Sequence, residues 1–140
     1  MSTISEQDEP VTAGPVAQVH VLAARPEAAA EARHLVTAAC SAWSRNGVCD
    51  SAALVVTELV ANGVRHAATP LTLRIVPIAR GLRLEVADDS TRGVRVKDAR
   101  LLDEGGRGLF LVDALAGRWG VDAHPVGKRV WAELRDDDEL

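Results

Sequence analysis

The stretch from residue 51 to residue 66 constrains the fold more than any other part of the chain. On a helical wheel of about 100° per residue, its small and apolar side chains fill roughly half of the circumference: Ala52, Val55, Val56, Leu59, Val60, Gly63 and Val64. A helix of this kind buries one side against a second layer. Glu58, Asn62 and His66 recur at every fourth position along one border of the apolar half. Polar side chains at such a border can line a pocket without losing all contact with water.

Two runs of alternating apolar residues follow this helix. Leu71, Leu73 and Ile75 alternate with polar side chains, and after Arg80-Gly81 the alternation resumes through residues 82–86. A period of two is typical of strands, and a glycine turn between two such runs indicates a hairpin. We therefore predict a β-hairpin of about residues 71–78 and 81–88.

The remaining patterns complete an α+β order of elements. They predict a strand within 16–23, a helix from Pro26 to the Asn46-Gly47 stop, a helix capped by Asp50 or Ser51, a third helix over 108–116, and strands over 119–123 and 129–134. This order favours a two-layer sandwich, with three helices on one face of a mostly antiparallel mixed sheet. Residues 16–135 are expected to form the domain. Residues 1–15 and the acidic end 136–140 have the composition of tails.

Composition narrows the possible functions. The chain has 140 residues and a net charge of −4, without a long basic run, which argues against direct binding to nucleic acid. Cys40 and Cys49 are interpreted as free thiols, which fits a reducing compartment. No apolar run reaches the roughly 18 residues of a membrane span, and residues 1–18 do not resemble a secretory signal. We expect a cytoplasmic protein with no membrane contact.

Three polar side chains carry possible chemistry. Asn62 offers an amide oxygen of the kind that binds Mg²⁺ together with substrate phosphates, and Glu58 is placed to act as a general base. Asp88 at a strand end can accept a hydrogen bond from an exocyclic amine such as that of adenine. Each of the three also has an ordinary interpretation when taken alone: a helix-surface amide for Asn62, a solvated carboxylate for Glu58 and a turn-forming aspartate for Asp88. The ordinary interpretation of His66 is a helix-end imidazole.

A glycine-rich turn precedes the third predicted helix. Gly105, Gly106 and Gly108 allow the backbone to approach a phosphate at a helix start, and Arg107 adds charge. A plain helix-start turn is the alternative. The spacing matches neither the P-loop nor the Rossmann pattern, because no lysine follows the glycines and no βαβ unit surrounds them. A nucleotide site here requires a different ATP-binding fold.

Together these motifs resemble those of the GHKL ATPase superfamily, which includes DNA gyrase, heat-shock chaperones and histidine kinases. The closer similarity is to its bacterial anti-sigma-factor serine/threonine kinases, and it covers about residues 19–134. In that family a helix carries Glu, then Asn four residues later, then commonly His-Ala, and Glu58, Asn62, His66 and Ala67 match. The resemblance implies the GHKL (Bergerat) ATP-binding fold, with Glu58 as catalytic base and Asn62 as the Mg²⁺ ligand.

The other motifs match in the same order. Asp88 matches the strand-end aspartate that contacts adenine, and residues 104–109 match the second glycine box. Trp119-Gly120 and residues 127–131 look like the closing sheet of small bacterial members. The resemblance implies ATP and Mg²⁺ as cofactors, and these cofactor-binding residues: Asn62, His66, Asp88, Gly105, Gly106, Arg107, Gly108 and Leu109.

The implied activity is ATP-dependent phosphorylation of a small STAS-type anti-sigma-factor antagonist, with a sigma factor as the second partner and a homodimer as a compatible assembly. The first glycine box departs from the family pattern, because Asp88 is followed by Asp89, Ser90 and Thr91, and Gly93 is the next glycine. The alternative prediction is therefore a docking module that regulates a sigma factor or antagonist by binding alone. A third is a small ATPase unit that signals through dimerisation. The stretch 90–104 is expected to be a loop that covers the site.

Overall fold

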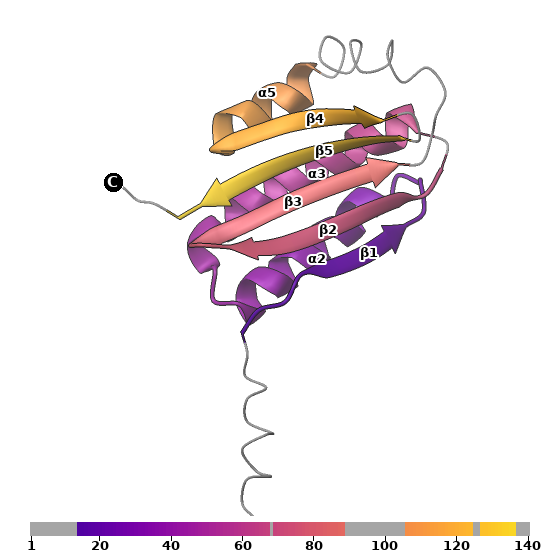
Figure 1. The fold of residues 1–140 in the computed structure, drawn as a ribbon. Helices are drawn as coiled ribbons and strands as arrows, with labels where there is room; N and C mark the ends of the chain where they lie inside the picture. The colour runs from indigo at the N-terminus through magenta and orange to yellow at the C-terminus, as the bar shows by residue number, and fades with distance from the viewer. Residues whose placement is uncertain (1–13, 68, 89–105, 125–126, 137–140) are drawn as a thin grey trace, which may run out of the picture.

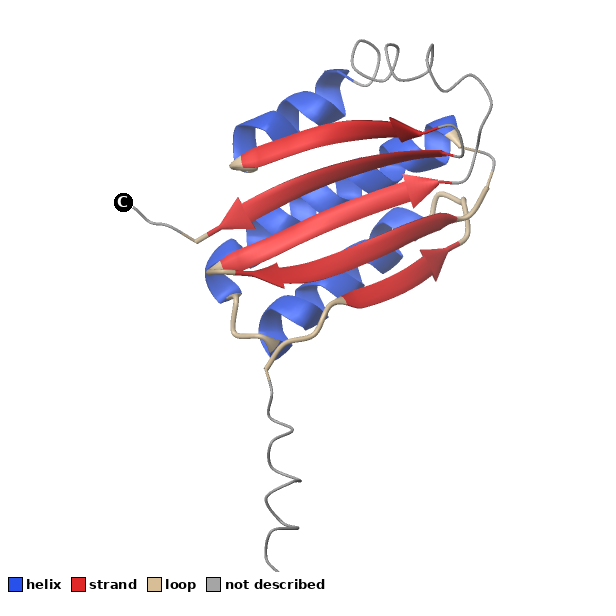
Figure 2. Ribbon diagram, in the orientation of Figure 1, coloured by secondary structure: helices blue, strands red, loops and turns tan. Residues whose placement is uncertain are grey.

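A five-stranded antiparallel sheet with three helices packed on one face forms the protein (Figures 1 and 2). The computed structural model describes residues 14–67, 69–88, 106–124 and 127–136. The strand order is β1-β2-β3-β5-β4, and all four pairings between these strands are antiparallel. The predicted α+β two-layer sandwich is confirmed, and its described sheet contains only antiparallel pairs.

The elements follow the predicted order. They are β1 (Gln18–Leu22), α2 (Ala28–Ala42), a short 3-10 helix η2 (Asn46–Val48), α3 (Cys49–His66), β2 (Leu71–Ile78), β3 (Gly81–Asp88), α5 (Gly106–Leu115), β4 (Arg118–His124) and β5 (Gly127–Arg135). The hairpin of β2 and β3 has the predicted bounds. The other elements lie within a few residues of the predicted ranges.

The start of α3 differs from the prediction. Neither Asp50 nor Ser51 caps it, because the chain enters through η2 and the cap position is Val48, which has no side-chain cap hydrogen bond. Val48 is 4% exposed and belongs to the core. Burial of Val48 therefore fixes the entry of the helix, and Asp50 lies in the first turn, where a carboxylate favours the positive end of the helix dipole.

The turn between β2 and β3 is tight. Ile78 pairs with Gly81, so two residues connect the strands, and Arg80 adopts a φ of 59°. A Cβ atom built on Gly81 would lie 1.8 Å from the carbonyl oxygen of Leu134 in β5. The glycine at this position is required by the close approach of a third strand, and not only by the turn.

The core lies between the helices and one face of the sheet. Alternate strand residues supply one side of it, and they are almost fully buried: Leu71, Leu73, Ile75, Leu82, Leu84, Val86, Val130, Ala132 and Leu134. The segment Asn46–His66 is long and apolar enough by composition to cross a membrane. Its apolar residues Val55, Val56, Leu59 and Val60 are at most 1% exposed inside this core, so α3 is the central helix of the domain.

The opposite face of the sheet, here called the open face, carries a lattice of charges. The Glu85 side chain is 6% exposed and accepts hydrogen bonds from Arg83 Nε at 2.7 Å and Arg74 Nη1 at 2.9 Å. The nearest nitrogen of Arg129 lies 3.9 Å away. Burial alone would raise the pKa of Glu85, but the arginine hydrogen bonds hold it below its ordinary value.

Arg83 links this cluster to a second carboxylate. Its Nη1 donates to Glu133 at 2.9 Å, and its guanidinium carbon lies 4.2 Å from the centre of the Trp131 ring. Arg118 and Arg135 also approach Glu133, at 3.5 and 3.4 Å. Burial again acts to raise the pKa of Glu133, and the surrounding arginines lower it below the ordinary value. One arginine therefore joins two nearly buried carboxylates on neighbouring strands.

Candidate functional site

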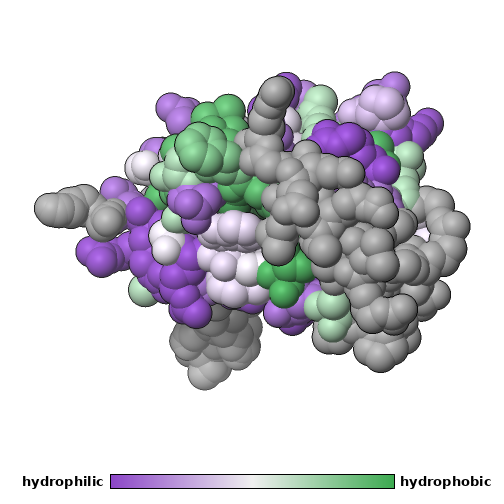
Figure 3. Space-filling view, turned by 90° about the horizontal axis from the view of Figure 1, so that it is seen from above, coloured by the Kyte–Doolittle hydropathy of each residue, from purple (hydrophilic) through white to green (hydrophobic). Residues whose placement is uncertain are grey.

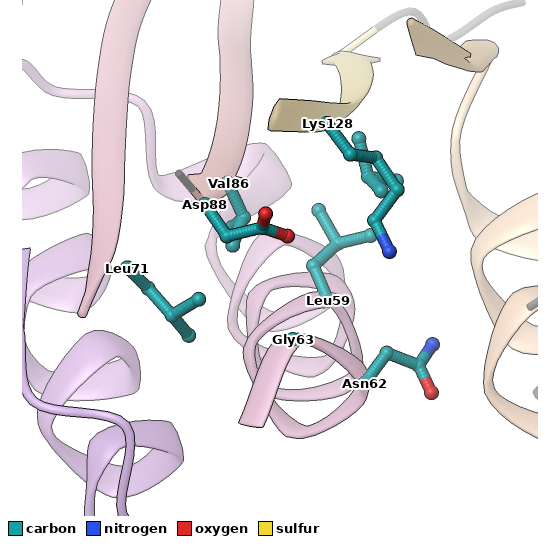
Figure 4. Close-up of a pocket in the computed structure, with 8 residues that line it drawn as sticks. Leu59, Asn62, Gly63, Leu71, Val86, Asp88 and Lys128 are labelled. Atoms are coloured by element: carbon teal, nitrogen blue, oxygen red, sulfur yellow. The ribbon is translucent and has the colours of Figure 1, made fainter. Parts of the chain in front are cut away.

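A pocket lies between α3 and the ends of three strands on the helix-covered face of the sheet (Figure 4). Eight described residues line it: Leu59, Asn62 and Gly63 of α3, Leu71 of β2, Val86 and Asp88 of β3, and Lys128 and Val130 of β5. Most of the wall is aliphatic, with three polar side chains at its border. A few convergent polar groups in an apolar wall are typical of small-molecule sites.

Asn62 is the central polar residue of the pocket. It is 3% exposed, and its Oδ1 accepts a hydrogen bond from Arg65 one turn later. Its Nδ2 has no hydrogen-bond partner among the described residues. A buried amide with an open donor is costly, so this position suits a ligand that brings an acceptor oxygen.

Asp88 reaches the same pocket from the sheet. As the last residue of β3 it follows Leu84 and Val86 on the helix-facing side, and it is 8% exposed. Its register partners are Leu71 in β2 and Lys128 in β5. The strand alternation that the sequence shows therefore turns its carboxylate toward α3, as Figure 4 shows.

Lys128 is a pocket residue that the sequence analysis did not single out. It is 8% exposed, and Figure 4 shows its chain directed toward α3, with its amine on the side of the pocket nearest Asn62. The signal was present in the sequence, because Lys128 has the parity of Val130, Ala132 and Leu134, which all point into the core. A lysine with that parity must also face the helices.

Glu58 and His66 lie on α3, one turn before and one turn after Asn62. Both are partly buried, which agrees with their predicted place at the border of the apolar half. Neither lines the pocket itself. The helix therefore aligns the three polar residues as predicted, and it brings only Asn62 into contact with the enclosed space.

The glycine-rich segment is described in part. Gly106, Arg107 and Gly108 form the first turn of α5, and Leu109 is 4% exposed in the core. This helix packs against α3 and β4. Gly105, the first glycine box after Asp88 and the expected covering loop at 90–104 lie outside the described residues.

The described side chains provide few metal ligands. They contain no group of three or more His, Cys, Asp or Glu residues arranged to hold a metal ion. Mg²⁺ is usually bound by one or two protein oxygens together with substrate phosphates. Oδ1 of Asn62 is the atom that would act as such a ligand once Arg65 no longer donates to it, whereas the unpartnered Nδ2 is a donor and suits a phosphate oxygen instead.

Comparison with known proteins assigns the family. The protein-family model of the histidine kinase-like ATPase domain matches residues 22–134, a range that includes all of α2 and α3, the pocket and most of β5. The chain belongs to the histidine kinase-like ATPase family. Membership implies that the domain binds ATP, and it confirms the resemblance to GHKL ATPases. No curated protein matches the sequence at a significant level.

A solved structure supports the same fold. The crystal structure of the RsbU and RsbW domains of Rv1364c from Mycobacterium tuberculosis is similar, with a TM-score of 0.65 and 14% sequence identity. The similarity covers 86% of this chain and 32% of that one. This chain thus spans about a third of that protein, and at this identity the likeness shows the fold.

Proposed function

We propose that this chain is an anti-sigma regulatory kinase, which uses ATP and Mg²⁺ to phosphorylate a serine or threonine of a small STAS-type antagonist protein. A sigma factor would be its second partner, in the cytoplasm, and a homodimer is compatible with this role. The observation that carries the proposal is the meeting of Asn62 and Asp88 in one pocket of a histidine kinase-like ATPase domain. The similarity in fold to the structure that contains the RsbW domain of Rv1364c supports the proposed anti-sigma role.

The pocket side chains have distinct roles in this proposal. Asp88 would accept a hydrogen bond from the amine of adenine, and Asn62 would hold a Mg²⁺ ion that neutralises phosphate charge. The turn of Gly105, Gly106 and Gly108, with Arg107, binds the phosphates at the start of α5.

Transfer then requires one proton acceptor. The hydroxyl oxygen of the antagonist forms a bond to the γ-phosphorus, the bond from that phosphorus to the bridging oxygen breaks, and Glu58 receives the hydroxyl proton. ATP would supply the phosphoryl group, and bound Mg²⁺ would stabilise the charge that develops on it.

Replacing Glu58 tests this assignment. In Glu58→Gln we expect phosphotransfer to fall by at least about a hundredfold, the usual scale of general base catalysis, while ATP affinity stays near that of the wild type. Mass spectrometry of the antagonist and calorimetry with ATP measure the two effects. Glu31→Gln, an exposed position on α2, is the matched control. Phosphotransfer at the wild-type rate in Glu58→Gln would contradict the role of Glu58.

The altered sequence after Asp88 favours a second candidate, a docking module that regulates without catalysis. The two functions differ in their response to nucleotide. If ATP with Mg²⁺ at millimolar concentration raises Tm, the domain binds nucleotide in its folded state. No shift in Tm, together with tight binding to a sigma factor or antagonist, would favour the docking module.

A further inference from the structure

The pocket in its present form is narrow. The space left for a water-sized molecule is about 10 Å³, close to the minimum that holds one water. Pockets that accept drug-sized ligands measure about 300–1,000 Å³. Entry of a nucleobase between Asp88 and Gly63 therefore requires a lining side chain to move.

Most of the lining residues are held in place. Leu59, Leu71, Val86 and Val130 are at most 6% exposed and belong to the continuous core. Moving them disrupts packing on more than one side and costs contacts throughout the core. Gly63 has no side chain to move, and a Cβ there would already lie 3.0 Å from a methyl group of Leu71.

Lys128 differs from these residues. Its side chain is the longest of the eight that line the pocket, with four rotatable bonds, and Lys128 is the second residue of β5, next to the start of the strand. Its amine shares the pocket with the Asp88 carboxylate and the Asn62 amide, among aliphatic side chains (Figure 4), and at 8% exposure the residue has little contact with water. When the chain swings out, it regains water and rotamer freedom. Among the described lining residues, withdrawal of Lys128 is therefore the least costly way to open the pocket.

We propose that Lys128 gates the nucleotide pocket: its side chain fills the base end in the ligand-free protein, and ATP binds only to the arrangement in which it has withdrawn. This inference rests on the proposed function, because the ligand is the nucleotide of that function. Apparent affinity is then reduced by the fraction of molecules that are open, so an open fraction of about one-tenth weakens binding about tenfold.

Three variants separate volume from charge. Lys128→Ala removes both the chain and the ammonium group, whereas Lys128→Met keeps a chain of similar length without the charge. Arg135→Ala is the matched control, because it removes one positive charge from the opposite face of the same strand, where the side chain is 41% exposed. ATP binding in the presence of Mg²⁺ is measured by calorimetry for each variant and for the wild type.

The gate predicts a different result for each variant. Lys128→Ala should bind ATP about tenfold more tightly than the wild type. Lys128→Met should bind no more tightly than the wild type, because its chain is as long and has no charge to rehydrate outside the pocket, and Arg135→Ala should not change ATP affinity. Tm without ligand is measured for every variant, and Lys128→Thr, which suits a strand, replaces the alanine variant if that one does not fold.

Other outcomes overturn the proposal in distinguishable ways. Weaker binding by both Lys128→Ala and Lys128→Met would show that the ammonium group contacts the nucleotide, and equal binding by Lys128→Ala and wild type would show that the side chain is no obstacle. In both cases the proposed ATP-dependent function remains. If neither the wild type nor Lys128→Ala binds ATP, the gate and the proposed function both fail.

Discussion

Arg83→Met tests whether one arginine holds the open face of the sheet together. The substitution keeps an unbranched side chain of related length and removes the guanidinium group. The hydrogen bonds to Glu85 at 2.7 Å and to Glu133 at 2.9 Å are lost with it, as is the contact with the Trp131 ring. Two carboxylates that are 6% and 10% exposed then lose a shared partner.

The expected loss of stability can be worked from these contacts. A hydrogen bond to a charged group contributes about 1.5–3 kcal/mol, and a partly exposed cation–π contact about 0.5–1 kcal/mol. The lower bounds apply, because Arg83 is 23% exposed, Glu85 keeps Arg74, and Glu133 keeps Arg118 and Arg135. We expect a loss of about 3.5 kcal/mol, a large part of the stability of an ordinary domain.

Urea unfolding followed by circular dichroism measures the effect. Arg74→Met is the matched control, because Arg74 makes one such bond, to Glu85 at 2.9 Å, and its side chain is 42% exposed. A pair of that kind is worth at most about 1 kcal/mol. A loss below about 1 kcal/mol in Arg83→Met, or an equal loss in the control, would refute the central role of Arg83.

Three further predictions follow from burial in the core and on the open face. The pKa values of Glu85 and Glu133 are below the ordinary 4.5 in the folded state, so the stability that these carboxylates contribute is present above pH 4.5 and is lost as the pH falls through their folded pKa values. The urea midpoint should therefore fall in acid, and a midpoint that stays constant below pH 4.5 would contradict this prediction. Burial, with the contact to Cys49, raises the pKa of the Cys40 thiol to about 12, so iodoacetamide should modify the half-buried Cys49 first. Equal rates of modification at the two cysteines would contradict the burial of Cys40. Leu59→Ala should cost about 3–5 kcal/mol by leaving a cavity between core and pocket, and a loss below 1 kcal/mol would show that this site is loosely packed.

The sequence predicted those features that depend on periodicity. The alternation in residues 71–88 set both the bounds of the hairpin and the direction of Asp88. The helical period likewise placed Asn62 at the border of the core. Both signals are local, so they can be recognised in a single sequence without knowing which distant segments pack together.

Other features depend on contacts between distant segments. That Lys128 faces Asp88 follows from the pairing of β3 with β5, and the entry to α3 depends on burial of Val48 rather than on a capping side chain. Four-residue spacing aligned Glu58 with Asn62, but spacing alone did not tell which of them touches the enclosed space. The role of Glu58 stays a prediction until its variant is measured.

The order of the strands has a consequence for synthesis of the chain. β5 is the last strand in the sequence, yet it lies between β3 and β4 in the sheet. When a ribosome has produced everything up to His124, β4 still has no neighbour to pair with, and the pocket lacks the wall formed by Lys128 and Val130. The sheet of the nascent domain is therefore completed only when β5 has emerged, and until then its paired strands are β1, β2 and β3.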